Sequence, residues 1–149
     1  MAAASAEDLT ALMHLEGAFP AGQRWSEDSW RDELSASNRH VLVHREDDNA
    51  VTSAATFAIS DGVVDLHRIV TAPAAQRRGL ASALVAAGLE WARERGASRV
   101  LLEVEATNTA ALALYARQDF SPISERRDYY GPGAHAVVLE RCLIEGEQS

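Results

Sequence analysis

The chain has 149 residues, of which 47% are hydrophobic and 24% are charged, a composition that is ordinary for a soluble globular protein. This length suits one domain, and we expect residues 1–149 to form a single domain. The net charge of −8 argues against general nucleic-acid binding, which needs a basic surface. It fits a basic or amino-bearing partner, although acidity that serves only solubility is the commoner explanation.

The sequence also predicts the cellular compartment. No apolar run approaches the roughly 18 residues that would cross a membrane, so we expect no membrane span. The N-terminus lacks a basic region and turns acidic at Glu7 and Asp8, which argues against a signal peptide. One cysteine, Cys142, excludes an intrachain disulfide and suits a reducing compartment. We therefore predict a cytoplasmic protein. The histidines lack the spacing of metal ligands, and we predict no metal site.

The N-terminal region predicts two short helices that carry aromatic residues. Residues 8–16 place apolar side chains at helical spacing, and Gly17 is a plausible stop. Ser26 is a suitable N-cap for a second helix, which would bury Trp30. The aromatic residues here, Trp25 among them, are candidates for the wall of a substrate pocket. The alternative is that they are core, and we favour this alternative for Trp30.

Strand patterns alternate with turns through the middle of the chain. Residues 40–44, 51–59 and 63–71 predict an antiparallel meander, with turns at Glu46–Asn49 and at Asp61-Gly62. A first strand is hardly visible before the helices. Near the C-terminus, residues 123–127 and 135–142 predict a final hairpin.

An arginine- and glycine-rich turn follows the third strand and predicts an anion site. The turn, Gln76–Ala81, opens a long helix that we expect to stop at Gly96. At a helix start the N–H groups lack helical partners and the helix dipole favours negative charge, to which Arg77 and Arg78 add positive charge. We therefore predict a site for a phosphate-bearing ligand. An ordinary exposed helix start is the alternative.

A carboxylate interrupts the next strand, residues 99–104. This strand reads as apolar on both faces, as in a central strand reached by a β-α-β crossover, so Glu103 is expected to be buried. Such a group is rarely buried unless it is paired or functional. Catalysis is one interpretation, and neutralisation by an arginine such as Arg68 is the other. A helix from Thr107 to about residue 118 then places Asn108 and Tyr115 on one face.

These motifs resemble those of the GCN5-related N-acetyltransferases (GNAT) over nearly the whole chain. The resemblance rests on the turn Gln76-x-x-Gly79-x-Ala81 and on the run Leu102-Glu103-Val104-x-x-x-Asn108-x-x-Ala111-x-x-Leu114-Tyr115. Arg126-x-x-Tyr129-Tyr130 and Phe19-Pro20 with Trp25-Ser26 resemble the bacterial members that acetylate protein N-termini. The implied fold is α/β: a mostly antiparallel mixed sheet of six to seven strands with a splayed parallel pair, flanked by about four helices.

The resemblance also implies acetyl-CoA as cofactor and assigns residues to it. Glu103 would be the general base for the acceptor amine, and Tyr115 the general acid for the departing thiolate. A backbone N–H at Val70 or its neighbour would hold the oxyanion. The implied cofactor-binding residues are Ile69, Val70, Thr71, Arg77, Arg78, Gly79, Leu80, Ala81, Ser82 and Asn108. The implied substrate-binding residues are Trp25, Arg68, Tyr129 and Tyr130.

Two departures from the family pattern affect these expectations. Ala81 replaces a commoner glycine in the turn, and Arg68 stands where a neutral polar residue is common, so a cation there would alter which peptide ends are accepted. We expect acetylation of a protein N-terminal α-amino group, with a ribosomal protein among the candidate acceptors. Lysine side chains or a small-molecule amine are alternative acceptors, and a non-catalytic acyl-CoA-binding module is a further alternative. The sequence leaves the oligomeric state open.

Overall fold

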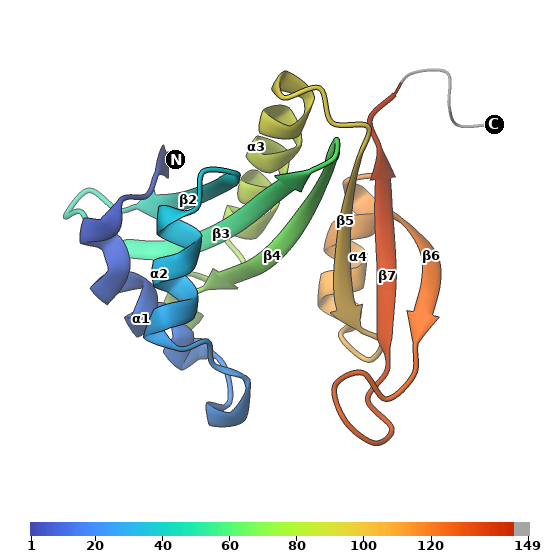
Figure 1. The fold of residues 1–149 in the computed structure, drawn as a ribbon. Helices are drawn as coiled ribbons and strands as arrows, with labels where there is room; N and C mark the ends of the chain where they lie inside the picture. The colour runs from blue at the N-terminus through green and yellow to red at the C-terminus, as the bar shows by residue number, and fades with distance from the viewer. Residues whose placement is uncertain (145–149) are drawn as a thin grey trace. The chain divides into compact units, whose positions relative to one another are not determined.

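The strands form one mixed sheet of order β1-β2-β3-β4-β5-β7-β6 in the computed structural model, which describes residues 1–144 (Figure 1). The strands of this sheet are β1 (Ala2–Ala3), β2 (Arg39–Arg45), β3 (Val51–Ser60), β4 (Val63–Thr71), β5 (Arg99–Glu105), β6 (Ser121–Arg126) and β7 (Ala136–Cys142). The described α-helices are α1 (Leu9–Leu15), α2 (Glu27–Ser35), α3 (Leu80–Glu94) and α4 (Thr109–Arg117). β4 and β5 run parallel, whereas β2 with β3, β5 with β7 and β6 with β7 run antiparallel. This arrangement confirms the expected fold class.

The chain divides into two compact units. The first comprises Met1–Ala58 with Leu66–Gly88, and the second comprises Ile59–Asp65 and the chain from Leu89 onward. The parallel pairing of β4 with β5 falls within the second unit, where it joins Val63, Val64 and Asp65 to Arg99, Val100 and Leu101. The expectation of a single domain over residues 1–149 stays a prediction.

The first unit packs helices on both faces of β2, β3 and β4. α1 and α2 lie on one face and the first part of α3 on the other (Figure 1). Trp30 is fully buried on the α1 and α2 face, which confirms its expected place in the core. The buried residues of this cluster are Leu12, Leu15, Trp30, Val41, Val43, Ala54 and Val70. Ser26 caps α2 as predicted, because its hydroxyl accepts the Ser29 N–H.

The second unit contains the antiparallel strands β5, β7 and β6, with α4 against them (Figure 1). Val100, Leu102 and Val104 are buried, as the alternation along β5 predicts. The other face of β5 is not apolar and buried, and Glu103 is exposed. The expectation of a buried Glu103 is therefore wrong, because in the second unit the opposite face of this strand carries the apolar contacts.

The start of the long helix also differs from the prediction. α3 begins at Leu80 rather than at Gln76, because Arg77 and Gly79 have φ angles of 68° and 77°, which a right-handed helix does not accept. β1 exists but has only two residues, Ala2–Ala3, which explains its weak signal. None of the described helices is long and apolar enough to span a membrane.

Candidate active site

The predicted phosphate-binding turn connects β4 to α3 and carries exposed arginines. The first hydrogen bond of the helix joins the Ala83 N–H to the Gly79 carbonyl at 3.0 Å, so the N–H groups of Leu80 and Ala81 precede the helical ladder. Gly79 supplies a left-handed conformation that other residues rarely adopt. An exposed helix N-terminus beside cationic side chains fits the phosphate groups of a cofactor such as coenzyme A.

One of the two arginines of this turn already has a partner. Arg78 pairs with Glu46, which follows β2, at 3.1 Å. Glu46 also accepts a hydrogen bond from the Thr52 hydroxyl at 2.9 Å and contacts His44 Nε2 at 2.9 Å. The Thr52 hydroxyl and then the Arg78 guanidinium lower the pKa of Glu46 below its usual value. The turn is thus tied to the β2–β3 hairpin through an ionised carboxylate.

Asn108 and Tyr115 both belong to the α4 region but differ in their surroundings. Asn108 is the N-cap of α4, and its side-chain oxygen accepts the Ala111 N–H at 3.1 Å. Its amide NH₂ is a separate pair of donors. Tyr115 is buried and meets Phe120 edge to face, with ring centroids 5.7 Å apart. Burial, and secondarily the charge of Tyr130, raises the pKa of Tyr115 to about 12. Tyr115 is therefore a protonated donor at neutral pH.

Glu103 lies in a cluster of aromatic and cationic side chains of the second unit. Arg126, at the end of β6, pairs with the Glu103 carboxylate at 2.8 Å. The Arg126 guanidinium carbon also lies 4.1 Å from the centre of the Tyr129 ring, and that ring meets Tyr130 at 5.0 Å. Burial and then the Glu103 charge raise the pKa of Tyr130 above its usual value. An arginine does pair with Glu103, as the alternative interpretation allowed, but it is Arg126 and not Arg68, which pairs with Glu16.

The turn that carries both tyrosines is held by hydrogen bonds within itself. The Asp128 N–H donates to His135 Nδ1 at 2.9 Å, and the Gly133 N–H donates to the Asp128 carboxylate at 2.7 Å. The Tyr130 N–H donates to the Ala134 carbonyl at 3.0 Å. About half of each tyrosine is exposed. The β6–β7 turn therefore presents two ordered aromatic rings to solvent.

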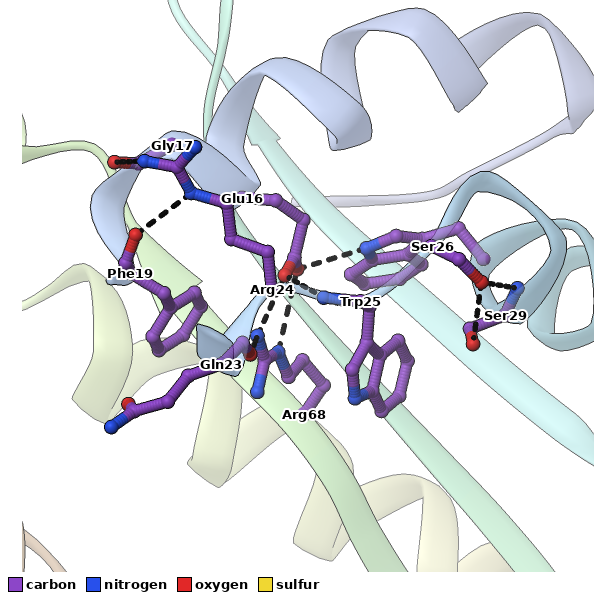
Figure 2. Close-up of polar contacts among 10 residues, drawn as sticks. Glu16, Gly17, Phe19, Gln23, Arg24, Trp25, Ser26, Ser29 and Arg68 are labelled. Carbon is purple, nitrogen blue, oxygen red and sulfur yellow. Dashed lines mark hydrogen bonds and ion pairs between the residues drawn. The ribbon is translucent and has the colours of Figure 1, made fainter. Parts of the chain in front are cut away.

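Arg68 on β4 lies among the residues of the α1–α2 connection in the first unit. Figure 2 shows its guanidinium directed at Glu16, and the two charged groups pair at 2.6 Å. The same guanidinium donates to the Gln23 carbonyl at 2.7 Å. Its carbon lies 3.8 Å from the centre of the Phe19 ring and 5.2 Å from that of Trp25. Arg68 and Trp25, both expected on the substrate side, are therefore neighbours.

The structure adds charged partners that sequence reasoning missed. The sequence places Glu16 only at the end of a predicted helix, and no spacing connects it with Arg68, which lies 52 residues away. Arg126 belongs to the motif with Tyr129 and Tyr130, but its pairing with Glu103 was not predicted. Among residues 1–144, no three His, Cys, Asp or Glu side chains gather as metal ligands would.

The chain belongs to the acetyltransferase (GNAT) family, whose pattern matches residues 7–120, and it is an N-acetyltransferase. It is 34% identical to the ribosomal protein bS18-alanine N-acetyltransferase of Escherichia coli K12 over 126 residues, which cover 83% of this chain and 81% of that one. The crystal structure of the ribosomal-protein-S18-alanine N-acetyltransferase from Escherichia coli has a TM-score of 0.88 to this fold at 25% identity, covering 99% and 96% of the two chains.

A further relative matches only part of its own length. The mycothiol acetyltransferase of Clavibacter sepedonicus is 38% identical over 93 residues, which cover 62% of this chain and 29% of that protein. Members of the family generally use acetyl-CoA, and the geometry of the turn before α3 fits such a cofactor.

Proposed function

We propose that this enzyme transfers the acetyl group of acetyl-CoA to the N-terminal α-amino group of a protein, with a ribosomal protein among the candidate acceptors. The observation that carries this proposal is the 34% identity over 83% of the chain to an enzyme named for alanine acetylation of ribosomal protein bS18. The similarity of the fold to an enzyme of the same activity supports it. The acceptor is inferred from these relatives.

The turn before α3 is the proposed site of the cofactor phosphates. The N–H groups of residues 77–82 and the exposed Arg77 would bind the pyrophosphate, and Asn108 would donate its NH₂ to the rest of the cofactor. The backbone of Ile69, Val70 and Thr71 would pair with the pantetheine arm. When bound, acetyl-CoA supplies the activated thioester carbonyl that the acceptor amine attacks.

Glu103 is the proposed general base. A protein N-terminus has a pKa of about 7.7–8.0 and is largely protonated at neutral pH, so a proton must leave before or during attack. The exposure of Glu103 gives it access to solvent, to which it passes the proton on. The Arg126 guanidinium, 2.8 Å away, fixes where the carboxylate lies.

Tyr115 is the proposed general acid. A thiolate of pKa about 8.5 departs more easily when a neighbouring hydroxyl protonates it. Because burial raises the pKa of Tyr115 to about 12, its hydroxyl carries its proton at neutral pH. Trp25, Arg68, Tyr129 and Tyr130 are the proposed acceptor-binding residues.

An assay of free coenzyme A tests this function. The enzyme is incubated with acetyl-CoA and a peptide that begins Ala-Arg, and thiol release is followed. The matched control is the same peptide with a formylated N-terminus, and a polyamine represents small-molecule acceptors. We expect release with the free peptide and background release with the other two. Release with the polyamine alone, or with the blocked and free peptides alike, would contradict the proposal.

A further inference from the structure

Glu16 is a buried carboxylate for which the proposed chemistry has no use. It follows α1 and is only 1% exposed. Oε1 accepts the Trp25 N–H at 2.8 Å and Arg68 Nη2 at 2.6 Å. Oε2 accepts Trp30 Nε1 at 2.9 Å and Arg68 Nε at 3.3 Å. A carboxylate has about four lone-pair sites, so these four hydrogen bonds occupy all of the accepting sites of Glu16.

The four bonds converge from three separate parts of the first unit. Trp25 lies in the α1–α2 connection, Trp30 is in α2 and Arg68 is in β4. The arginine fork contacts both oxygens of the carboxylate, which is the strongest geometry for such a pair. A buried ion pair is no more stabilising than well-packed apolar side chains of similar volume. Its distinctive effect is geometric, because it fixes the positions of the groups it joins.

The segment that Glu16 fixes has little regular structure of its own. Between α1 and α2 it contains only two short 3₁₀ turns, Glu16–Ala18 and Ala21–Gln23. Glu16 holds this segment directly at the Trp25 N–H, and it also holds Arg68, which in turn donates to the Gln23 carbonyl at 2.7 Å. Figure 2 shows these contacts around the guanidinium and the two aromatic rings of Phe19 and Trp25.

We propose that Glu16 is the positioning residue of the acceptor side, which holds Arg68 and the backbone at Trp25 in the geometry that binds the peptide. This inference rests on the proposed function, which places Trp25 and Arg68 against the acceptor. Glu16 is itself too buried to touch the acceptor, and none of its four bonds reaches the turn at residues 76–82 that would bind the cofactor. Its removal should therefore affect the Michaelis constant of the peptide and leave that of acetyl-CoA unchanged.

Glu16→Gln is the principal variant. The glutamine has nearly the same shape, but it replaces one acceptor oxygen by an NH₂ group, so two donors lose their partner. Bonds to charged groups of this kind correspond to an effect of about tenfold or more. We expect the KM of the Ala-Arg peptide to rise at least about tenfold, with the KM of acetyl-CoA and kcat changed less than about twofold. Glu7→Gln, which removes an exposed carboxylate from the same unit, is the matched control.

A second variant keeps the inference testable if Glu16→Gln does not fold. Glu16→Gln with Arg68→Met removes both charges together, so that no unpaired charge is buried. We expect this protein to fold, to bind acetyl-CoA as the wild type does and to show a raised peptide KM. A wild-type peptide KM in Glu16→Gln, or an equal rise in both Michaelis constants, would overturn the role of Glu16 alone. A wild-type peptide KM in the double variant would overturn the role of Glu16 and also exclude Arg68 from acceptor binding. A wild-type enzyme that acetylates no peptide would overturn the proposed function as well.

Discussion

At the scale of single residues, the proposed chemistry needs one group that accepts a proton and another that donates one. Glu103 and Tyr115 differ in this way because of their surroundings. Glu103 is exposed and lies beside the Arg126 guanidinium, whereas Tyr115 is buried and its pKa is raised to about 12. The two residues thus offer an exposed carboxylate and a protonated hydroxyl, the two kinds of group that the proposed chemistry requires.

The role of Glu103 is tested by Glu103→Gln. The amide retains the shape but cannot take the proton, so we expect kcat/KM for the peptide to fall about 10²-fold or more. The affinity for acetyl-CoA should change little, as measured by isothermal titration. Glu105→Gln, two residues along the same face of β5, is the control and should keep most of the activity. Equal activities of the two variants would exclude Glu103 as the base.

The role of Tyr115 is tested by Tyr115→Phe. The ring remains to pack against Phe120, so thermal stability should be nearly unchanged, while kcat falls about 10²-fold or more because the proton donor is lost. The donor is lost from the wild type only as pH rises toward 12. The ratio of wild-type to variant rates should therefore be constant between about pH 7 and about pH 10. A kcat of Tyr115→Phe equal to that of the wild type would contradict this assignment.

Predictions for single residues were correct where they depended only on neighbouring positions in the sequence. The alternation along β5 correctly placed Glu103 opposite Leu102 and Val104. Its burial was mispredicted, because burial depends on which elements cover each face of a strand, and an apolar run of five or six residues does not encode that. Likewise, the sequence offered no means to connect Glu16 with Arg68, since the pair depends on how β4 and the α1–α2 connection meet.

At the scale of elements, the first unit depends on close contact between α3 and the sheet. Gly88 lies on the face of α3 that meets Phe57 of β3, and a Cβ at this position would lie 2.1 Å from the end of the phenyl ring. Phe57 is itself only 1% exposed, so its ring is enclosed by other parts of the protein. A glycine inside a helix costs about 1 kcal/mol relative to alanine. At Gly88 this loss of helix propensity is offset by the close packing of α3 against Phe57.

Gly88→Ala is therefore expected to destabilise the protein despite the higher helix propensity of alanine. Overpacking of this kind costs typically about 1–3 kcal/mol, which corresponds to a fall in Tm of several degrees for a chain of this size. Gly17→Ala is the control, since a Cβ there meets nothing within 4 Å. Scanning calorimetry would compare the two, and a Tm of Gly88→Ala at or above that of the wild type would contradict the packing described here.

The order and type of the main elements were predictable because they depend on local periodicity and caps. Ser26 correctly marked the start of α2, and the hairpin near the C-terminus was found within about two residues. The start of α3 was not predicted correctly, since nothing in the sequence shows that Arg77 takes a left-handed conformation. β1 could hardly be predicted, because a strand of two residues is too short to show the alternation of apolar and polar side chains that marks a strand.

At the scale of the whole molecule, the acidic chain contains carboxylates that stabilise the fold itself. Glu33 on α2 accepts a hydrogen bond from Thr56 at 2.7 Å, contacts His67 at 3.1 Å and accepts another bond from Arg39 at 3.1 Å. Burial alone would raise its pKa, but bonds from His67, Thr56 and Arg39 outweigh it and lower the pKa of Glu33 from 4.5 to about 2. One carboxylate thus connects α2 with β2, β3 and β4.

This shift predicts how stability depends on pH. Because the pKa of Glu33 is lower in the folded state, its contribution is present above about pH 4.5 and is lost as pH falls toward about 2, an effect on the order of 2–3 kcal/mol. The free energy of unfolding of Glu33→Gln should therefore differ most from the wild type near pH 6 and least near pH 2. Glu27→Gln, an exposed site on α2, is the control. A difference independent of pH in urea unfolding would contradict this role.

The central claim is that the acetyl group goes to an α-amino group, and mass spectrometry of the product tests it most directly. A peptide that begins with alanine and contains one internal lysine offers both kinds of amine in one molecule. After incubation with acetyl-CoA, fragmentation of the product locates the added acetyl group. We predict acetylation at the N-terminal alanine with the lysine unmodified. Acetylation of the lysine with a free N-terminus would contradict the account.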